Sequence, residues 1–217
     1  MIETITNLGD AALLLPASFL LFCHLRWRGD SKRAMSLALV IAVCLTITIL
    51  AKLAFLAVGV DCFYASVHSP SGHTSFSATF YGCCAALTTS DEAPLRRRFA
   101  WIAAVALVLA IAVSRVVVGA HNLAEVVIGL AIGLICVGLF LHLTRERAPT
   151  AGLPQFALGI VALAIVLQGT HLTLEPLLQT IADRLGFMAT SRCSAQNDAA
   201  PLPRGALAYR HGTRTQA

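Results

Sequence analysis

Long apolar stretches follow one another along this sequence, and they restrict the fold more than any other feature does. Six of them are long enough or nearly long enough to cross a bilayer, at roughly 9–25, 34–60, 74–89, 99–118, 123–143 and 153–172. In lipid, each backbone polar group must be satisfied within its own segment, so these stretches are expected to be helices. The sequence therefore predicts an all-α, polytopic membrane helix bundle with about six transmembrane helices.

The composition agrees with a protein whose solvent is the bilayer. Hydrophobic residues make up 57% of the chain and charged residues only 12%, whereas about 25% is usual in a soluble domain. We expect one membrane-embedded domain over residues 1–187. Residues 188–217 lack apolar periodicity and predict a disordered basic tail. The net charge of +5 does not indicate a nucleic-acid partner, because the basic residues lie between the apolar stretches.

The basic residues alternate between successive loops. They occupy the first, third and fifth loops, at Arg26, Arg28, Lys32, Arg33, Arg96, Arg97, Arg98, Arg145 and Arg147. The second and fourth loops, at roughly 61–73 and 115–122, contain Arg115 alone. The positive-inside rule then places the second and fourth loops on the non-cytoplasmic face. We expect an integral protein of the bacterial inner membrane, with these loops facing the periplasm or exterior. Whether the sixth stretch crosses stays open, because the tail after it is also basic.

The second loop ends in a sequence typical of an anion site. Ser69 can cap a helix that begins at Pro70, since proline is favoured at the first helical position. The amide N–H groups of Ser71, Gly72 and His73 would then point out of the helix start, where phosphate binds readily. Gly72 would let an oxyanion approach the backbone closely.

The fourth loop contains a second set of polar residues. His121 and Glu125 are four residues apart, so on a helix they would share one face, and the carboxylate could fix the imidazole tautomer. Arg115 offers a planar fork for phosphate oxygens. Lys52 starts deep in the second apolar stretch and should therefore face a polar cavity.

Each of these features also has an ordinary interpretation when it is taken singly. The motif at 70–73 could be a turn, His121 an interfacial histidine and Glu125 a helix-start carboxylate, while Arg115 and Lys52 could extend toward lipid head groups. All of them nevertheless map to the same membrane face, and the histidines played no part in assigning that face. Their conjunction favours a functional site.

Together these residues resemble the type 2 phosphatidic acid phosphatase superfamily, which also includes vanadium haloperoxidases. Its second motif, Pro-Ser-Gly-His, is present as Pro70-Ser71-Gly72-His73. Its third motif, Ser-Arg, five residues, His, three residues, Asp, is matched by Ser114, Arg115 and His121, with Glu125 at the aspartate position.

The first motif of that family, Lys, six residues, Arg-Pro, is matched in part. Lys52 stands at the lysine position, but Gly59 and Val60 stand where the family has Arg-Pro. The resemblance covers roughly residues 52–130, and the second and third motifs carry its specificity.

The resemblance implies a two-step phosphoryl transfer that needs no metal and no cofactor. His121 would attack phosphorus and form a phosphohistidine, His73 would protonate the leaving oxygen, and Glu125 would orient His121. The phosphate would be bound by Lys52, Ser71, Gly72 and Arg115.

The implied substrate is a phospholipid or isoprenyl phosphate in the bilayer, such as phosphatidic acid, phosphatidylglycerol phosphate or an isoprenyl diphosphate. A second hypothesis is a protein with weak or no catalytic activity that binds or carries anionic lipid head groups, because of the altered positions 59, 60 and 125. Halide oxidation ranks lower, because the haloperoxidase branch is soluble. The sequence predicts no oligomeric state.

Overall fold

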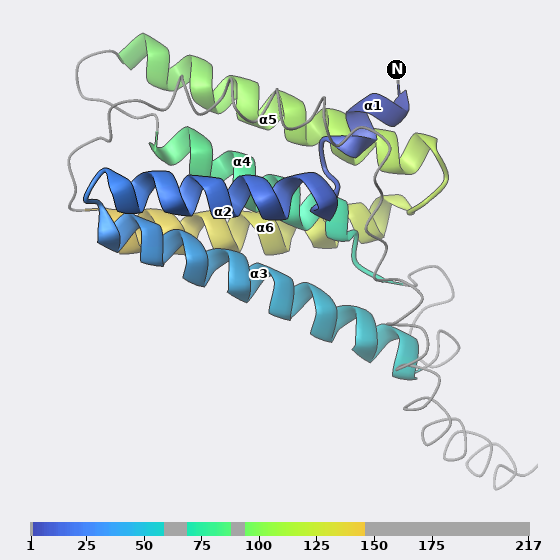
Figure 1. Ribbon diagram of the computed structural model, residues 1–217. Coiled ribbons are helices and arrows are strands. Elements are labelled where there is room, and N and C mark those ends of the chain that lie inside the picture. The colour runs from blue at the N-terminus through green and yellow to red at the C-terminus, as the bar shows by residue number, and fades with distance from the viewer. Residues whose placement is uncertain (1, 59–68, 88–93, 146–217) are drawn as a thin grey trace, which may run out of the picture.

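The computed structural model describes residues 2–58, 69–87 and 94–145, and within these ranges it is helical, with no strand (Figure 1). The helices are α1 (Ile2–Asn7), α2 (Ala11–Trp27), α3 (Ser31–Val58), α4 (Gly72–Leu87), α5 (Pro94–Val117) and α6 (Leu123–Thr144). The predicted all-α class is confirmed. Helices α2 to α6 correspond to the first five predicted stretches, whereas the short helix α1 was not predicted.

Three of these helices are long and apolar enough to cross a membrane. The candidate spans are Ser31–Ala54, Leu95–Val117 and Leu123–Thr144, and α2 is a shorter apolar helix. The membrane character predicted from composition is thus supported. The count of six transmembrane helices stays a prediction, because the sixth stretch at 153–172 lies outside the described residues, as do the rest of 146–187 and the tail at 188–217.

Helix α4 is the centre of the bundle. It packs against α6, α5, α3 and α2, and most of its residues are buried. Its 16 residues would extend about 24 Å, less than a typical hydrocarbon core. A helix enclosed by other helices does not need to match the lipid thickness. Its buried hydroxyls are satisfied internally: Thr48 Oγ1 on α3 lies 3.0 Å from Ser75 Oγ, and Thr79 donates to the Ser75 carbonyl at 2.8 Å.

Glycines permit the close approach of α4 and α6. Gly129 and Gly133 are four residues apart on α6, the spacing typical of close helix contacts in membranes. A Cβ at Gly133 would lie 2.5 Å from the Ala78 Cβ and 2.8 Å from the Ser75 carbonyl oxygen. A Cβ at Gly129 would lie 2.5 Å from the Ser71 carbonyl oxygen. The two helices therefore meet backbone to backbone.

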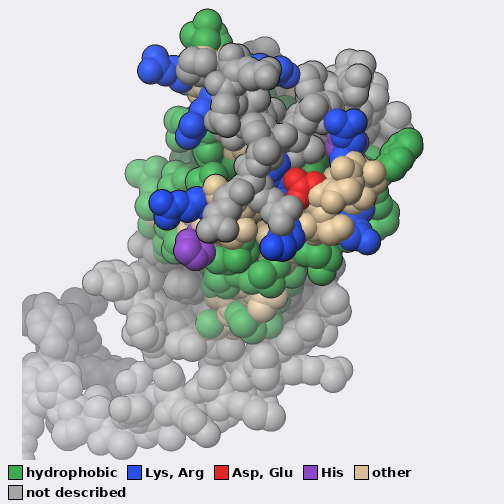
Figure 2. All heavy atoms as spheres, turned by 90° about the vertical axis from the view of Figure 1, so that its left-hand side faces the viewer, with side chains coloured by type: hydrophobic (Ala, Val, Ile, Leu, Met, Phe, Trp, Pro, Cys, Tyr) green, Lys and Arg blue, Asp and Glu red, His purple; other side chains and the backbone are tan. Residues whose placement is uncertain are grey.

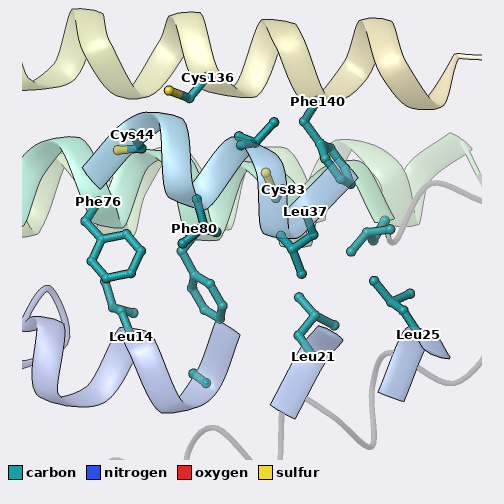
Figure 3. Packing of buried hydrophobic residues seen from close by; sticks show 14 of the residues in the cluster. Leu14, Leu21, Leu25, Leu37, Cys44, Phe76, Phe80, Cys83, Cys136 and Phe140 are labelled. Atoms are coloured by element: carbon teal, nitrogen blue, oxygen red, sulfur yellow. The ribbon is translucent and has the colours of Figure 1, made fainter. Parts of the chain in front are cut away.

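Larger apolar side chains fill the rest of the interior. Figure 3 shows Phe76 and Phe80 of α4 directed toward the leucines of α2, and Phe140 of α6 beside Leu37 of α3. Small residues thus set the distance between α4 and α6, while leucine and phenylalanine occupy the wider spaces between the other helices.

The two ends of the bundle carry different charge. Figure 2 shows one end, where Lys and Arg side chains gather around the α2–α3 connection, the start of α5 and the end of α6. The basic residues at these positions are Arg26, Arg28, Lys32, Arg33, Arg96, Arg97, Arg98 and Arg145. The opposite end, at the right of Figure 1, is where α2, α4 and α6 begin and α3 and α5 end. The predicted site residues lie at this second end.

The glycine contact can be tested by adding one methyl group. We expect Gly133→Ala to destabilise the protein by about 1–3 kcal/mol, because the new Cβ would overlap the backbone of α4. Gly138→Ala is the matched control on the same helix, since nothing lies within 4 Å of its added Cβ. Thermal unfolding of the two variants in one detergent checks this. Equal midpoints would contradict the close α4–α6 contact.

Candidate active site

The connection between α5 and α6 is built by local backbone rules. Gly119 has φ 72°, which glycine adopts at no steric cost. The Gly119 N–H donates to the Val116 carbonyl at 3.0 Å and the Ala120 N–H to the Arg115 carbonyl at 3.1 Å. These two bonds form a Schellman motif that ends α5. The His121 N–H also donates to the Arg115 carbonyl, at 3.2 Å, so the motif holds His121 over the last turn of α5.

Glu125 then joins His121 to the start of α6. Asn122 caps the helix by accepting from the Glu125 N–H at 2.9 Å, and Glu125 Oε2 accepts from the Asn122 N–H at 3.2 Å. The same Oε2 lies 2.8 Å from His121 Nδ1. The contact expected from the spacing is therefore present, but its predicted geometry was wrong. His121 precedes the cap and does not share a helical face with Glu125, because α6 begins at Leu123.

Two other oxygens of Glu125 bind the segment before α4. Its Oε1 accepts from the Ser69 N–H at 3.1 Å, and its backbone carbonyl accepts from the Ser71 N–H at 3.1 Å. The side chain is only 4% exposed. A buried carboxylate is tolerable when several donors surround it. Glu125 thus fixes His121 and the segment 69–71 relative to each other.

The predicted start of α4 was wrong by two residues. The helix begins at Gly72 rather than at Pro70, and Ser71 rather than Ser69 provides the cap, with Thr74 N–H 3.5 Å from Ser71 Oγ. The Ser71 N–H, which we expected to face a ligand, donates to Glu125 instead. The Ser69 N–H donates to the Glu125 carboxylate, and Ser69 lies three residues before the first residue of the helix. The first-turn amides of Gly72 and His73 are the ones in position to receive an anion.

Lys52 lies beside this helix start. It is buried on α3, and its Cε would be 3.9 Å from a Cβ added at Gly72. The other close atom would be Thr48 Cγ2 at 3.8 Å, an ordinary contact distance. Packing by the described residues therefore does not require glycine at position 72. The structure brings Lys52 to the helix start, and an atom the size of a Cβ would fit beside Gly72 in ordinary contact with Thr48 and Lys52.

Burial and charge together decide the protonation of His121. Burial is the largest influence and lowers the pKa of His121, and the positive charges of Arg115 and Lys52 act in the same direction. The hydrogen bond and charge of Glu125 raise it, but the net pKa is below the ordinary 6.5. At neutral pH the ring is therefore neutral. With Nδ1 directed at Glu125, Nε2 carries the lone pair.

One residue near the site was missed by the sequence interpretation. Asp10 caps α2 by accepting from the Ala12 N–H at 2.9 Å, and its Oδ2 lies 3.9 Å from His73 Nε2. The only signal in the sequence was an aspartate before the first apolar stretch, which is typical of any helix cap. Its proximity to His73 depends on how α2 and α4 pack.

The structure places the seven predicted site residues at one end of the bundle: Lys52, Ser71, Gly72, His73, Arg115, His121 and Glu125. Gly59 and Val60 lie outside the described residues. Within the described ranges, no group of three or more His, Cys, Asp or Glu side chains is arranged to hold a metal ion. The expectation of a metal-independent site stays a prediction.

A known protein family matches the part of the chain that contains most of these site residues. Residues 58–149 match the family model described as the PAP2 superfamily. This match supports an assignment of the chain to the PAP2 superfamily. The match includes α4, α5 and α6, and therefore His73, Arg115, His121 and Glu125, while Lys52 precedes it. PAP2 membership suggests phosphatase-type activity for the chain.

One curated relative covers most of the chain. It is an uncharacterized 22.5 kDa protein of the cps region of Klebsiella pneumoniae, 29% identical over 191 residues, which are 85% of this chain and 91% of the relative. No solved structure matches the chain significantly. The relative is similar over most of the chain but adds no function.

The buried position of Glu125 predicts a large effect on stability. Glu125→Ala would leave the amides of Ser69 and Asn122 without their acceptor, and each such loss costs about 1–3 kcal/mol. We expect the thermal midpoint to fall by at least about 4 °C. Glu3→Ala, at an exposed site in α1, is the control and should leave the midpoint unchanged. Equal midpoints would show that Glu125 does not hold the site together.

Proposed function

We propose that this protein is an integral membrane phosphatase that hydrolyses a lipid phosphate monoester or diphosphate without a metal ion. The observation that carries the proposal is the contact of Glu125 Oε2 with His121 Nδ1 at 2.8 Å. It leaves a neutral imidazole whose Nε2 can act as a nucleophile, with Arg115 and Lys52 close enough to affect its charge. A neutral nucleophile between two cations suits attack on a negatively charged phosphorus centre.

In the first step, His121 Nε2 forms a bond to phosphorus while the bond to the leaving oxygen breaks. His73 donates a proton to that oxygen, so the lipid alcohol or lipid phosphate leaves in a neutral or less charged form. Glu125 stabilises the positive charge that develops on the His121 ring. The non-bridging oxygens are stabilised by Arg115, Lys52 and the amides at the start of α4.

In the second step, water attacks the phosphohistidine. The neutral His73 accepts a proton from this water as the new P–O bond forms. The bond between phosphorus and His121 Nε2 breaks, which regenerates the neutral imidazole and releases inorganic phosphate. His73 is then protonated again for the next cycle.

The surroundings of the site favour a lipid substrate. Val116, Val117, Val118 and Leu123, which flank the α5–α6 connection on both sides of His121, expose much of their apolar surface. An apolar rim beside a cationic site fits a molecule with a phosphate head and a hydrocarbon chain. Phosphatidic acid, phosphatidylglycerol phosphate and isoprenyl diphosphates share this form.

The charge difference between the two ends supports an orientation. The site lies at the end opposite the basic residues shown in Figure 2. The positive-inside rule places that basic end in the cytoplasm. The proposed site then faces the periplasm or the exterior of a bacterial inner membrane.

Phosphate release with and without His121 tests the mechanism. Purified parent protein in a metal-chelating buffer should release phosphate from at least one of the three lipid classes. His121→Ala should reduce release by at least about 1,000-fold, because it removes the nucleophile. His142→Ala, at the exposed opposite end of α6, is the control and should keep full activity. Turnover by His121→Ala at the parent rate would rule out the phosphohistidine, and lipid binding without turnover by the parent would identify a carrier.

The protonation of His121 predicts a pH dependence. The nucleophile must be neutral, and its lowered pKa implies that kcat falls on acidification only below about pH 6.5. Because Glu125 raises this pKa, Glu125→Gln should move the acid limb to still lower pH and also reduce the maximal rate. The ionisation of the substrate is common to both proteins, so the difference between their profiles reports on the enzyme. An acid limb that shifts upward in the variant would contradict the assignment.

A further inference from the structure

The segment before α2 is fixed against the site at several points. Thr6 Oγ1 donates to Ser114 Oγ on α5 at 2.8 Å, one residue before Arg115. The Leu8 carbonyl accepts from the Tyr81 hydroxyl of α4 at 2.8 Å. A Cβ at Gly9 would lie 2.7 Å from Ile111 Cγ2 and 3.5 Å from the His73 Cβ. The segment therefore lies directly on the start of α4.

Asp10 follows this anchored segment, and its two carboxylate oxygens contact different groups. Oδ1 accepts from the Ala12 N–H at 2.9 Å and caps α2, while Oδ2 lies 3.9 Å from His73 Nε2. Asp10 is 7% exposed. At 3.9 Å the contact with His73 is electrostatic rather than a hydrogen bond. The carboxylate can thus stabilise a charged imidazole without taking its proton.

The other charges around His73 act against its protonated form. His73 lies outside the three candidate spans. Burial and the positive charge of Arg115 lower the pKa of His73 to about 4, and Lys52 and His121 act in the same direction. The carboxylate of Asp10 is the group that raises it. Glu125 is engaged with His121 on the other side of the site.

We propose that Asp10 is a positioning residue for His73, whose nearby carboxylate stabilises the protonated form of the imidazole and keeps the ring in place to donate to the leaving oxygen. This inference rests on the proposed phosphatase function. The two histidines would then each have a carboxylate with a distinct task. Glu125 orients a neutral nucleophile through a hydrogen bond at 2.8 Å, and Asp10 stabilises a charged proton donor from 3.9 Å.

Removing the charge of Asp10 while keeping its cap isolates this role. Asparagine and serine both cap helices, so Asp10→Asn and Asp10→Ser should fold. Asp30→Asn is the control, because Asp30 accepts from the Arg33 N–H at 3.2 Å near the start of α3, at the opposite end of the bundle. All variants are studied as full-length protein in lipid nanodiscs.

The first readout is how the rate of phosphate release depends on the leaving group of the substrate. Proton donation matters for a poor leaving group such as a lipid alkoxide and much less for p-nitrophenolate. We expect Asp10→Asn to slow release from a lipid phosphate by about tenfold or more and release from p-nitrophenyl phosphate by less than about twofold. Equal losses on both substrates would overturn the proposal.

The second readout does not need turnover. The His73 ring resonance, assigned by its absence from His73→Gln, is titrated by NMR in the parent and the variants. Asp10→Asn should lower the His73 midpoint by about one pH unit, whereas Asp30→Asn should leave it unchanged. An unchanged midpoint in Asp10→Asn overturns the assignment of Asp10. If the parent hydrolyses no phosphate ester but the midpoint shifts, the phosphatase function fails while the pairing of Asp10 with His73 stands.

Discussion

The carboxylate of Glu125 connects the start of α6 with a segment that is distant in sequence. It completes the capping box with Asn122, contacts His121, and accepts from the backbone of the segment before α4. Burying a carboxylate is costly unless donors surround it. Glu125 meets this need for donors by binding both His121 and the segment before α4. These contacts hold the candidate nucleophile beside the candidate phosphate site.

Glutamate is one methylene longer than aspartate, and the contacts at position 125 use this extra length. Oε2 must reach both the Asn122 N–H and His121 Nδ1, while Oε1 reaches the Ser69 N–H across the interface with α4. A capping box uses a glutamate or glutamine three residues after the cap. Glu125 thus serves both the local helix start and the site, and its side-chain length suits both contacts.

Part of the site follows from local rules and was visible in the sequence. Gly119 ends α5 and Asn122 begins α6 by motifs that extend over a few residues, so the spacing of Arg115, His121 and Glu125 predicted their association. The start of α4 was predicted wrongly, because the helix preference of Ser69-Pro70 competes with a tertiary interaction. Glu125 takes the Ser69 amide and leaves the cap to Ser71. Asp10 could not be recognised for a related reason, since its distance from His73 is set by the packing of the first ten residues on α4 and α5.

The sequence by itself determined the helical class, the apolar exterior and the placement of the basic loops at the end opposite the site residues. These properties depend on segment length, hydropathy and charge, which can be read along the chain. Only the tertiary structure decided which amides face a ligand and which are bonded to Glu125, and only it placed Asp10 beside His73. Hydrogen bonds and ion pairs between distant segments depend on ångström distances, and those are set by how α1, α4 and α6 pack rather than by any local pattern.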